Sequence, residues 1–521
     1  MKLLRAILFG TALTLGAQQP RPVWTEPGAN VQGAPSLDGR FLSCMDPASG
    51  DLALRDLSNG AMRRLTERKT AGEFAYFSVI SPDNRSVAYA WFNESGFYDL
   101  RAASADGSAP PRILYRNEEA GFVQPSAFSP DGKQILTLLF RRDNTSQIAL
   151  VGTADGSLRV LKSLNWVYPK KMDFSPDGKY IVYDTFAADG AEQRDIFVLA
   201  ADGSSERRLV EHPANDLFPV WVRDGTRVLF ASDRGGTMDL WTVRVADGKP
   251  AGAPELVKRD IGRFLPMGVT REGACFFGLR TGGTDVHVGD ATASPSSAPL
   301  ESRYAGRTSS PAWSGDGKRL AYLARAGTEN FGQEARILVI REMKTGEERA
   351  LTPKLAHFEN LKWSPDGRRI LAGGSDSKGH AGLFAIDVAT GQTKPAVLGE
   401  EGGYRGLDGA WSADGKAVVY VRGGSVRWRD LDTRQERELY RGPEGVRLDW
   451  VSLSADQASW TVRRANLMVT IPVAGGLAKV GAIPPGMKEG VSLHPDGRRV
   501  AYTVGAAKAE VWVMENFLPK P

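Results

Sequence analysis

Few side chains in this chain could do acid–base or metal chemistry. The five histidines are His212, His287, His357, His380 and His494. A zinc site needs three or four nitrogen or sulfur ligands, and no histidine pairs with another at ligand spacing. An acyl-transfer site needs a nucleophile, a base and an orienting acid, and the chain has no Gly-x-Ser-x-Gly elbow. We therefore expect no catalytic residues, no metal site and no cofactor.

Two histidines have an acidic residue close by in comparable places. His212 precedes Asp216, and His357 precedes Glu359, each just before the first strand of a repeat. Loops held on a rigid scaffold often carry recognition. These four residues are therefore our candidates for a binding site, and an ordinary loop role is the alternative.

The strands around these residues are separated by one recurrent turn, best written Ser-Pro-Asp-Gly. Its clearest copies lie at 129–132, 175–178 and 364–367. Counted at the glycine position, eleven copies fall at 39, 84, 132, 178, 225, 273, 317, 367, 415, 457 and 497, with steps of 40 to 50 residues. A period this steady indicates a repeat architecture. The recurrent aspartate is explained as a turn former, because no acidic run suits a calcium loop.

One repeat shows what the turn builds. Short apolar runs occupy 171–174, 180–183, 195–199 and 207–210, and turn signals separate them. Four short antiparallel strands of this kind make one propeller blade. No segment has a convincing helical period. A single propeller usually has about four to eight blades, so we predict an all-β chain with two tandem β-propellers of about eleven four-stranded blades.

The division of the chain follows from composition. Residues 1–17 are typical of a signal peptide, with Lys2 and Arg5 before an apolar run of eleven residues at 6–16. That run is shorter than the roughly 20 residues that span a bilayer, and an uncleaved anchor is the alternative. A Ser/Ala/Pro-rich stretch at 291–299 suggests a joint. We predict a first propeller of about six blades at 18–300 and a second of five to six blades at 301–521.

Charge and recurrent residue types exclude several roles. The net charge is +5 and basic residues are mixed with acidic ones, so no nucleic-acid partner is expected. Cys44 and Cys275 lie in apolar strands, and we interpret them as small buried hydrophobes rather than a disulfide. Four tryptophans close the first strand of their repeats: Trp221, Trp313, Trp363 and Trp411. Their recurrence indicates packing between blades rather than a carbohydrate platform.

The repeat resembles a known family. Residues 174–179, Phe-Ser-Pro-Asp-Gly-Lys, and the apolar strand that ends at Tyr183 are close to the WD-like propeller repeats of the TolB family. Residues 50–57 and 510–517 resemble the propeller regions attached to bacterial receptor-type serine/threonine kinases and transcriptional regulators. Similar propellers precede the hydrolase domain of dipeptidyl peptidase IV and prolyl oligopeptidase. We expect neither the α/β domain of TolB nor a hydrolase domain in this chain.

These observations favour an exported, non-catalytic scaffold. We expect a periplasmic or secreted monomer, without a membrane span in the mature chain, that binds a protein, peptide or glycan in the bacterial cell envelope. One alternative is an enzyme with a propeller-borne site, such as a polysaccharide lyase or hydrolase. Another is a detached sensor partner of an envelope kinase.

Overall fold

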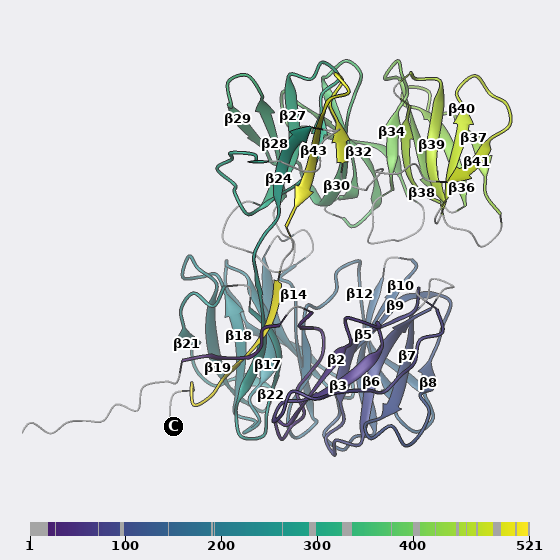
Figure 1. The fold of residues 1–521 in the computed structure, drawn as a ribbon. Coiled ribbons are helices and arrows are strands. Elements are labelled where there is room, and N and C mark those ends of the chain that lie inside the picture. The colour runs from purple at the N-terminus through teal and green to yellow at the C-terminus, as the bar shows by residue number, and fades with distance from the viewer. Residues whose placement is uncertain are drawn as a thin grey trace, which may run out of the picture.

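The fold is built entirely from β-strands in the part of the chain that the structure describes. This computed structural model describes residues 19–518 except 27, 71, 94–97, 144, 189–190, 192, 263, 291–297, 326–335, 377, 400–406, 423, 444–447, 455, 465–466, 483–490 and 506–507. Eleven antiparallel sheets form two β-propellers, one above the other in Figure 1. None of the described residues forms a helix long and apolar enough to cross a bilayer.

The first propeller has six blades. Their strands, from the centre outward in each blade, are β2 (Phe41–Met45), β3 (Leu52–Asp56) and β4 (Met62–Arg64); β5 (Phe74–Ile80), β6 (Ser86–Phe92), β7 (Tyr98–Ser104) and β8 (Arg112–Tyr115); β9 (Ala120–Phe128), β10 (Gln134–Arg141), β11 (Ser146–Gly152) and β12 (Leu158–Leu164); β13 (Met172–Phe174), β14 (Tyr180–Phe186), β15 (Arg194–Ala200) and β16 (Glu206–Val210); β17 (Asp216–Trp221), β18 (Arg227–Ser232), β19 (Asp239–Ala246) and β21 (Glu255–Lys258), with the short β20 (Lys249–Pro250); and β22 (Phe264–Val269), β23 (Cys275–Thr281), β44 (Lys508–Met514) and β1 (Arg21–Trp24). Pro35 pairs with Leu42 and adds an innermost bridge to the three-stranded sheet.

The second propeller has five blades. Their strands, in the same order, are β26 (Thr308–Trp313), β27 (Arg319–Arg325), β28 (Arg336–Glu342) and β29 (Glu348–Leu351); β30 (Leu355–Trp363), β31 (Arg369–Asp376), β32 (Ala381–Asp387) and β33 (Thr393–Leu398); β34 (Gly409–Trp411), β35 (Ala417–Arg422), β36 (Ser425–Asp430) and β37 (Glu436–Arg441); β38 (Asp449–Leu453), β39 (Ser459–Arg464), β40 (Leu467–Pro472) and β41 (Lys479–Ala482); and β42 (Val491–Leu493), β43 (Arg499–Val504), β24 (Asp285–Asp290) and β25 (Ala298–Pro299).

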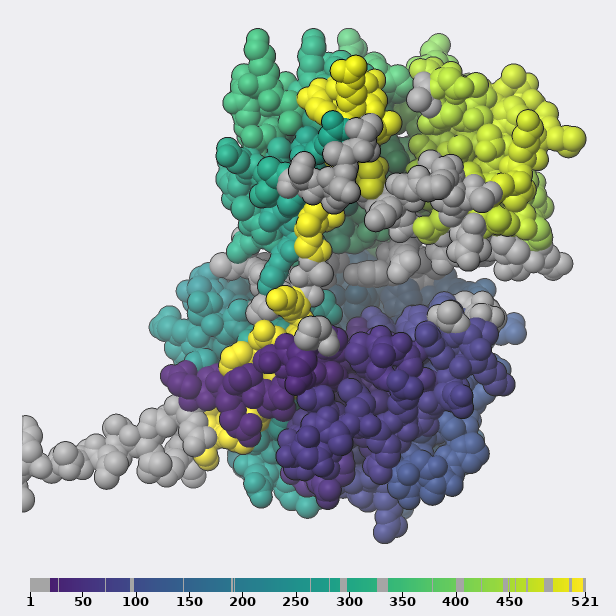
Figure 2. Space-filling view, viewed as in Figure 1, coloured from purple at the N-terminus to yellow at the C-terminus, as the bar shows by residue number. Residues whose placement is uncertain are grey.

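The two propellers exchange strands. The chain leaves the first propeller after β23, builds the second from β24 to β43, and returns as β44. Figure 2 shows this yellow C-terminal segment running from the upper propeller onto the lower one, beside the purple N-terminal segment. Sheet membership therefore differs from the division predicted at residue 300. β24 and β25 share a sheet with β43, and β44 shares one with β23, because each ring closes by pairing strands from distant parts of the chain.

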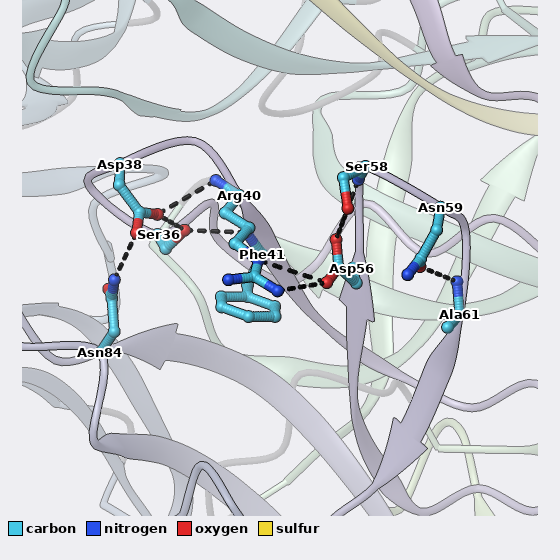
Figure 3. Close-up of polar contacts among 9 residues, drawn as sticks. All are labelled: Ser36, Asp38, Arg40, Phe41, Asp56, Ser58, Asn59, Ala61 and Asn84. Atoms are coloured by element: carbon cyan, nitrogen blue, oxygen red, sulfur yellow. Dashed lines mark hydrogen bonds and ion pairs between the residues drawn. The ribbon is translucent and has the colours of Figure 1, made fainter.

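The repeated turn carries the same hydrogen bonds in blade after blade. In the first blade, shown in Figure 3, the Ser36 hydroxyl donates to Asp38, the Arg40 N–H donates to Asp38 Oδ1 at 3.0 Å, and the Phe41 N–H donates to Ser36 Oγ at 2.9 Å. Asn84 of the next turn donates to Asp38 Oδ2 at 2.7 Å, which links two blades. Asn84 itself has φ of 60°, in the left-handed region that the glycine position requires.

We predict that Ser129→Ala lowers stability by about 1 to 3 kcal/mol, because the partly buried Gln134 N–H loses its acceptor. Ser129 Oγ accepts the Gln134 N–H at 3.0 Å and donates to Asp131 Oδ1 at 2.6 Å. That second bond, followed by the bond from the Lys133 N–H, holds the pKa of Asp131 below its usual value. A lowered carboxyl pKa stabilises the fold above the unfolded value of about 3.9, and this contribution is lost as pH falls toward the folded pKa.

Urea unfolding at pH 7 and pH 3 would test this prediction. The difference between wild type and Ser129→Ala should be larger at pH 7. The exposed Ser205→Ala serves as the control. An equal stability of Ser129→Ala and wild type at pH 7 would contradict the prediction.

The tryptophans that close first strands pack between blades, as predicted. The Trp363 indole N–H donates to the Ala312 carbonyl at 2.9 Å, and that of Trp411 donates to Lys362 at 3.1 Å. In each case an arginine of the preceding blade covers the indole, with Arg319 4.6 Å from the ring centroid of Trp363. The same arginine donates to the turn carbonyl of Gly367 at 3.0 Å.

Both cysteines are fully buried thiols in the first propeller. Burial is the main cause that raises the pKa of Cys44 and of Cys275 to about 12. Because the thiolate is the reactive form, we predict no reaction with Ellman's reagent in the native protein and two equivalents of reaction after denaturation. Rapid labelling of the native protein would contradict the buried placement.

Candidate binding face between the two propellers

Each propeller has one face that looks toward the other. We call it the junction face, because the chain leaves the first propeller at the end of β23 and re-enters it at the start of β44 (Figure 1). Second strands of blades end on this face and first strands begin there, whereas the Ser-Pro-Asp-Gly turns lie at the opposite face. His212 precedes β17 and Asp216 begins it, as predicted, whereas His357 and Glu359 lie within β30 and not in the loop before it. All four are in the junction half of a first strand or in the connection that leads to it.

His212 and Asp216 have separate structural partners in the first propeller. The His212 N–H donates to Asp195 at 3.4 Å, and its Nδ1 accepts the Ala214 N–H at 3.0 Å. Asp216 is fully buried and forms an ion pair with Arg234 at 2.6 Å. Burial raises the pKa of the Asp216 carboxyl, although Arg234 opposes that shift. These contacts hold the connection between β16 and β17 in place. The binding role that we predicted for His212 and Asp216 stays a prediction.

His357 and Glu359 do come together in the second propeller. They lie on one side of β30, with Nε2 of the histidine 3.5 Å from Oε2 of the glutamate. Arg336 of the neighbouring blade donates to the Phe358 carbonyl at 3.0 Å and lies 3.9 Å from Glu359. Over the described ranges, no group of three His, Cys, Asp or Glu side chains is placed to hold a metal ion.

A cluster of six half-buried aromatic side chains lies on the junction face of the first propeller. They come from the second and third blades, at the start of β5, the facing ends of β6 and β7, and the start of β9. The six are Phe74, Tyr76, Phe77, Phe92, Tyr98 and Phe122. Ring centroids of neighbours are 4.6 to 6.5 Å apart, and most pairs meet edge to face. Phe77 has φ of 38° at a bulge of β5, a conformation that re-aims a side chain.

The cluster continues into the fourth blade. Phe122 is the cross-strand partner of Phe140, whose ring centroid lies 6.0 Å from that of Tyr168. Two further half-buried rings, Trp166 and Phe186, are also 6.0 Å apart. We call the complete set of ten rings the aromatic band: Phe74, Tyr76, Phe77, Phe92, Tyr98, Phe122, Phe140, Trp166, Tyr168 and Phe186. An extended apolar surface that stays partly open is characteristic of an interaction site.

The band reaches the second propeller at Trp166. A Cβ built on Gly379, in the turn between β31 and β32, would lie 2.2 Å from Cγ of Trp166. Gly379 also has φ of 84°, in the left-handed region. Only glycine fits this close approach, so Trp166 joins the band to the contact between the propellers.

Charged groups around the band are largely paired with one another. Asp99 is fully buried and accepts from Arg101 at 2.7 Å and from Arg116 at 2.6 Å. Asp184 is also fully buried and pairs with Arg194 at 2.8 Å. Lys170 donates to the Tyr168 hydroxyl at 3.2 Å and lies 4.3 Å from its ring centroid. Burial, followed by the charge of Arg194, lowers the pKa of Lys170 to about 7.

Sequence reasoning missed the aromatic band, although one signal for it was present. Phe92, Phe140 and Phe186 stand at or next to the end of the second strand in three successive repeats. Each of them looks like an ordinary strand residue by itself. Only their recurrence at the repeat period, on one face, indicates a shared surface.

Comparison with known proteins identifies the repeat. Residues 92–253 match the family model described as TolB beta propeller domain. The chain is 27% identical over 168 residues to the Tol-Pal system protein TolB of Anaeromyxobacter dehalogenans, which covers 31% of this chain and 36% of that protein. It is 36% identical over 73 residues to dipeptidyl-peptidase 5 of Porphyromonas gingivalis, covering 13% of this chain and 11% of that one. The match thus spans about a third or less of these relatives' length.

One solved structure was also aligned with this chain. The crystal structure of TolB from Acinetobacter baumannii is 16% identical, with a TM-score of 0.26, and the alignment covers 71% of this chain and 80% of that chain.

Proposed function

Because the chain carries TolB-type β-propeller repeats, we propose that it is a non-catalytic scaffold of the bacterial cell envelope, exported to the periplasm or secreted. Its partner is a protein, peptide or glycan that binds between the two propellers. The observation that supports this proposal is the aromatic band. Six of its rings contact one another, the other four form two pairs, and all ten stay half-buried on one face, and aromatic side chains dominate the energetics of interfaces.

The band also has the support that a recognition surface needs. Eight of its ten rings lie in strands of three blades, with Trp166 and Tyr168 in the connection between β12 and β13, and the buried ion pairs of Asp99 and Asp184 lie beside it. Side chains held on rigid strands lose less conformational entropy when a partner binds than those on free loops. The TolB-type repeats support a place in the envelope.

A capture experiment tests the proposal. The full chain is immobilised and exposed to an envelope extract, and the captured material is compared for wild type, Phe122→Ala and Tyr440→Ala. Tyr440 is a half-buried aromatic residue of β37, away from the band. We predict that Phe122→Ala lowers saturable capture about ten-fold or more, whereas Tyr440→Ala leaves it unchanged.

Two results would count against the scaffold. One is capture that Phe122→Ala does not change. The other is turnover of a glycan or peptide that is lost in His357→Gln or Glu359→Gln, which would favour the propeller-borne enzyme.

A further inference from the structure

The chain passes between the two propellers at two neighbouring points. The outgoing strand leaves the first propeller after Thr281, and the returning strand enters it again at Lys508, the cross-strand partner of Thr281. The matching pair in the second propeller is Asp285 with Val504. Figure 1 shows both crossings on the same side of the molecule, below β24 and β43. All covalent connections between the propellers therefore run through one narrow two-stranded strip.

Glycines lie on both strands of this strip. Gly282 and Gly505 are exposed and have φ of 76° and 103°, in the left-handed region. Thr284 already belongs to the second propeller, since it pairs with Arg307 and its carbonyl accepts the Thr308 N–H at 2.8 Å. Glycine has the widest range of backbone angles, and a hinge between domains consists of a few residues that absorb large changes in φ and ψ. The strip thus has the composition of a hinge.

The contact between Trp166 and Gly379 lies far from this strip in both rings. Trp166 stands between the third and fourth blades of the first propeller, whereas β23 and β44 belong to its sixth blade. Gly379 lies in the second blade of the other propeller, whereas β24 and β43 belong to its fifth blade. In each ring these positions face one another across the axis. A rotation at the strip therefore displaces the contact farther than it displaces the blades beside the strip.

The second propeller meets Trp166 with a polar hairpin. Lys378 and His380 on either side of Gly379 are exposed, and His380 forms an ion pair with Asp376 at 2.9 Å. Water can solvate these groups when the contact separates. Interfaces between domains of one chain resemble transient interfaces, and relative motion is expected unless they are large and hydrophobic.

We infer that the two propellers form a hinged pair, which opens by rotation at Gly282 and Gly505 and separates Trp166 from Gly379. Opening exposes the end of the aromatic band at Trp166, and closing covers that end again. This inference goes beyond the proposed scaffold function, because the motion needs no ligand. It gives the junction face two states that differ in access to the band.

A wedge at the contact tests the hinge. Gly379→Leu places a side chain where Trp166 stands, so the propellers should stay open. We expect a larger radius of gyration in small-angle X-ray scattering and several-fold faster hydroxyl-radical oxidation of Trp166, measured by mass spectrometry. Gly379→Leu combined with Trp166→Ala keeps the strained backbone angle but has room for the leucine, so its radius of gyration should return to that of wild type. Oxidation of Tyr440 should not change.

A disulfide across the same contact tests whether the hinge opens without a wedge. A Cβ built on Gly379 lies 2.6 Å from Cβ of Trp166, and a disulfide needs about 3.5 to 4.5 Å between these atoms, so a small shift lets the bond form in Trp166→Cys combined with Gly379→Cys. The native cysteines are buried and do not compete. The ring of Phe186, which neighbours Trp166, should be oxidised several-fold more slowly after treatment with glutathione disulfide than in the reduced form.

Two results would overturn the hinge. One is a Gly379→Leu chain that melts earlier or fails to fold, while its partner variant with Trp166→Ala folds, and that shows neither a larger radius of gyration nor faster oxidation of Trp166. That is the behaviour of one rigid block, in which the clash cannot be relieved by opening. The other is equal oxidation of Phe186 in the oxidised and reduced forms of the double-cysteine variant. Neither result bears on the scaffold function, which the capture experiment tests separately.

Discussion

Val511→Asp is expected to open the first propeller, although Val511 follows the whole second propeller in the sequence. Val511 lies in β44, between Gly278 of β23 and Trp24 of β1. Its side chain is fully buried in a cluster with Leu42, Cys44 and Phe276. An unpaired carboxylate in this core should cost more than about 4 kcal/mol. The milder Val511→Ala should cost about 2 kcal/mol, through lost burial and the cavity that remains.

The two buried thiols report this opening directly. Cys44 shares the cluster of Val511, and Cys275 is the cross-strand partner of Met514 in β44. We expect Ellman's reagent to label both cysteines in Val511→Asp under conditions that leave wild type unlabelled. Lys508→Ala, an exposed change in the same strand, should behave as wild type. Thiols that stay protected in Val511→Asp would show that β44 does not hold the first propeller closed.

Arg194→Ala is expected to cost about 3 to 5 kcal/mol, because it leaves a buried carboxylate without its counter-ion. Arg194 Nη1 lies 2.8 Å from Asp184, and Nη2 donates to the Tyr168 carbonyl at 3.0 Å. The guanidinium also lies 4.9 Å from the ring centroid of Phe186. The substitution therefore removes support from two rings of the aromatic band as well as the ion pair.

The cost of Arg194→Ala should depend on pH. Burial raises the pKa of Asp184 above its usual value, and Arg194 is the largest opposing influence. A carboxyl whose folded pKa is raised binds its proton more tightly in the folded state, so its contribution is most favourable at low pH and falls as pH rises through the folded pKa. Without Arg194 that pKa rises further. The stability difference from wild type should thus shrink as pH falls from 7 toward 4.

Chemical denaturation across this pH range measures the effect. Asp184→Asn combined with Arg194→Ala removes the uncompensated charge and should recover part of the loss at pH 7. Stability of the double variant below that of Arg194→Ala would contradict an electrostatic origin. Ser205→Ala again provides an exposed control.

The repeat and the blade count follow from the sequence because turn chemistry is local. Ser129, Asp131 and Gly132 are held by hydrogen bonds that span five residues or fewer, so each copy specifies its hairpin without help from the rest of the chain. The packing of Trp363 and Trp411 between blades could be predicted for the same reason. A side chain that recurs with the repeat meets the same neighbour each time.

The strand exchange could not be read from the sequence. β23 and β44 pair from Cys275–Met514 to Thr281–Lys508, across more than 200 residues of intervening chain. Both strands have ordinary apolar patterns, and neither pattern indicates which strand it pairs with. The Ser/Ala/Pro-rich stretch at 291–299 looked like a joint, yet the strands on both sides of it belong to the second propeller.

An all-β repeat protein with eleven turns follows from the amino-acid sequence, because Ser, Asp and Gly act on their own backbone. Which strands close each propeller, and which side chains form a surface, depends on how the blades pack in three dimensions. Phe74, Phe122 and Phe186 are separate strand residues until the blades arrange around one axis and bring their ends to one face. His357 and Glu359 meet because a strand places alternate residues on one side, whereas His212 and Asp216 each have a different partner, the Ala214 N–H and Arg234.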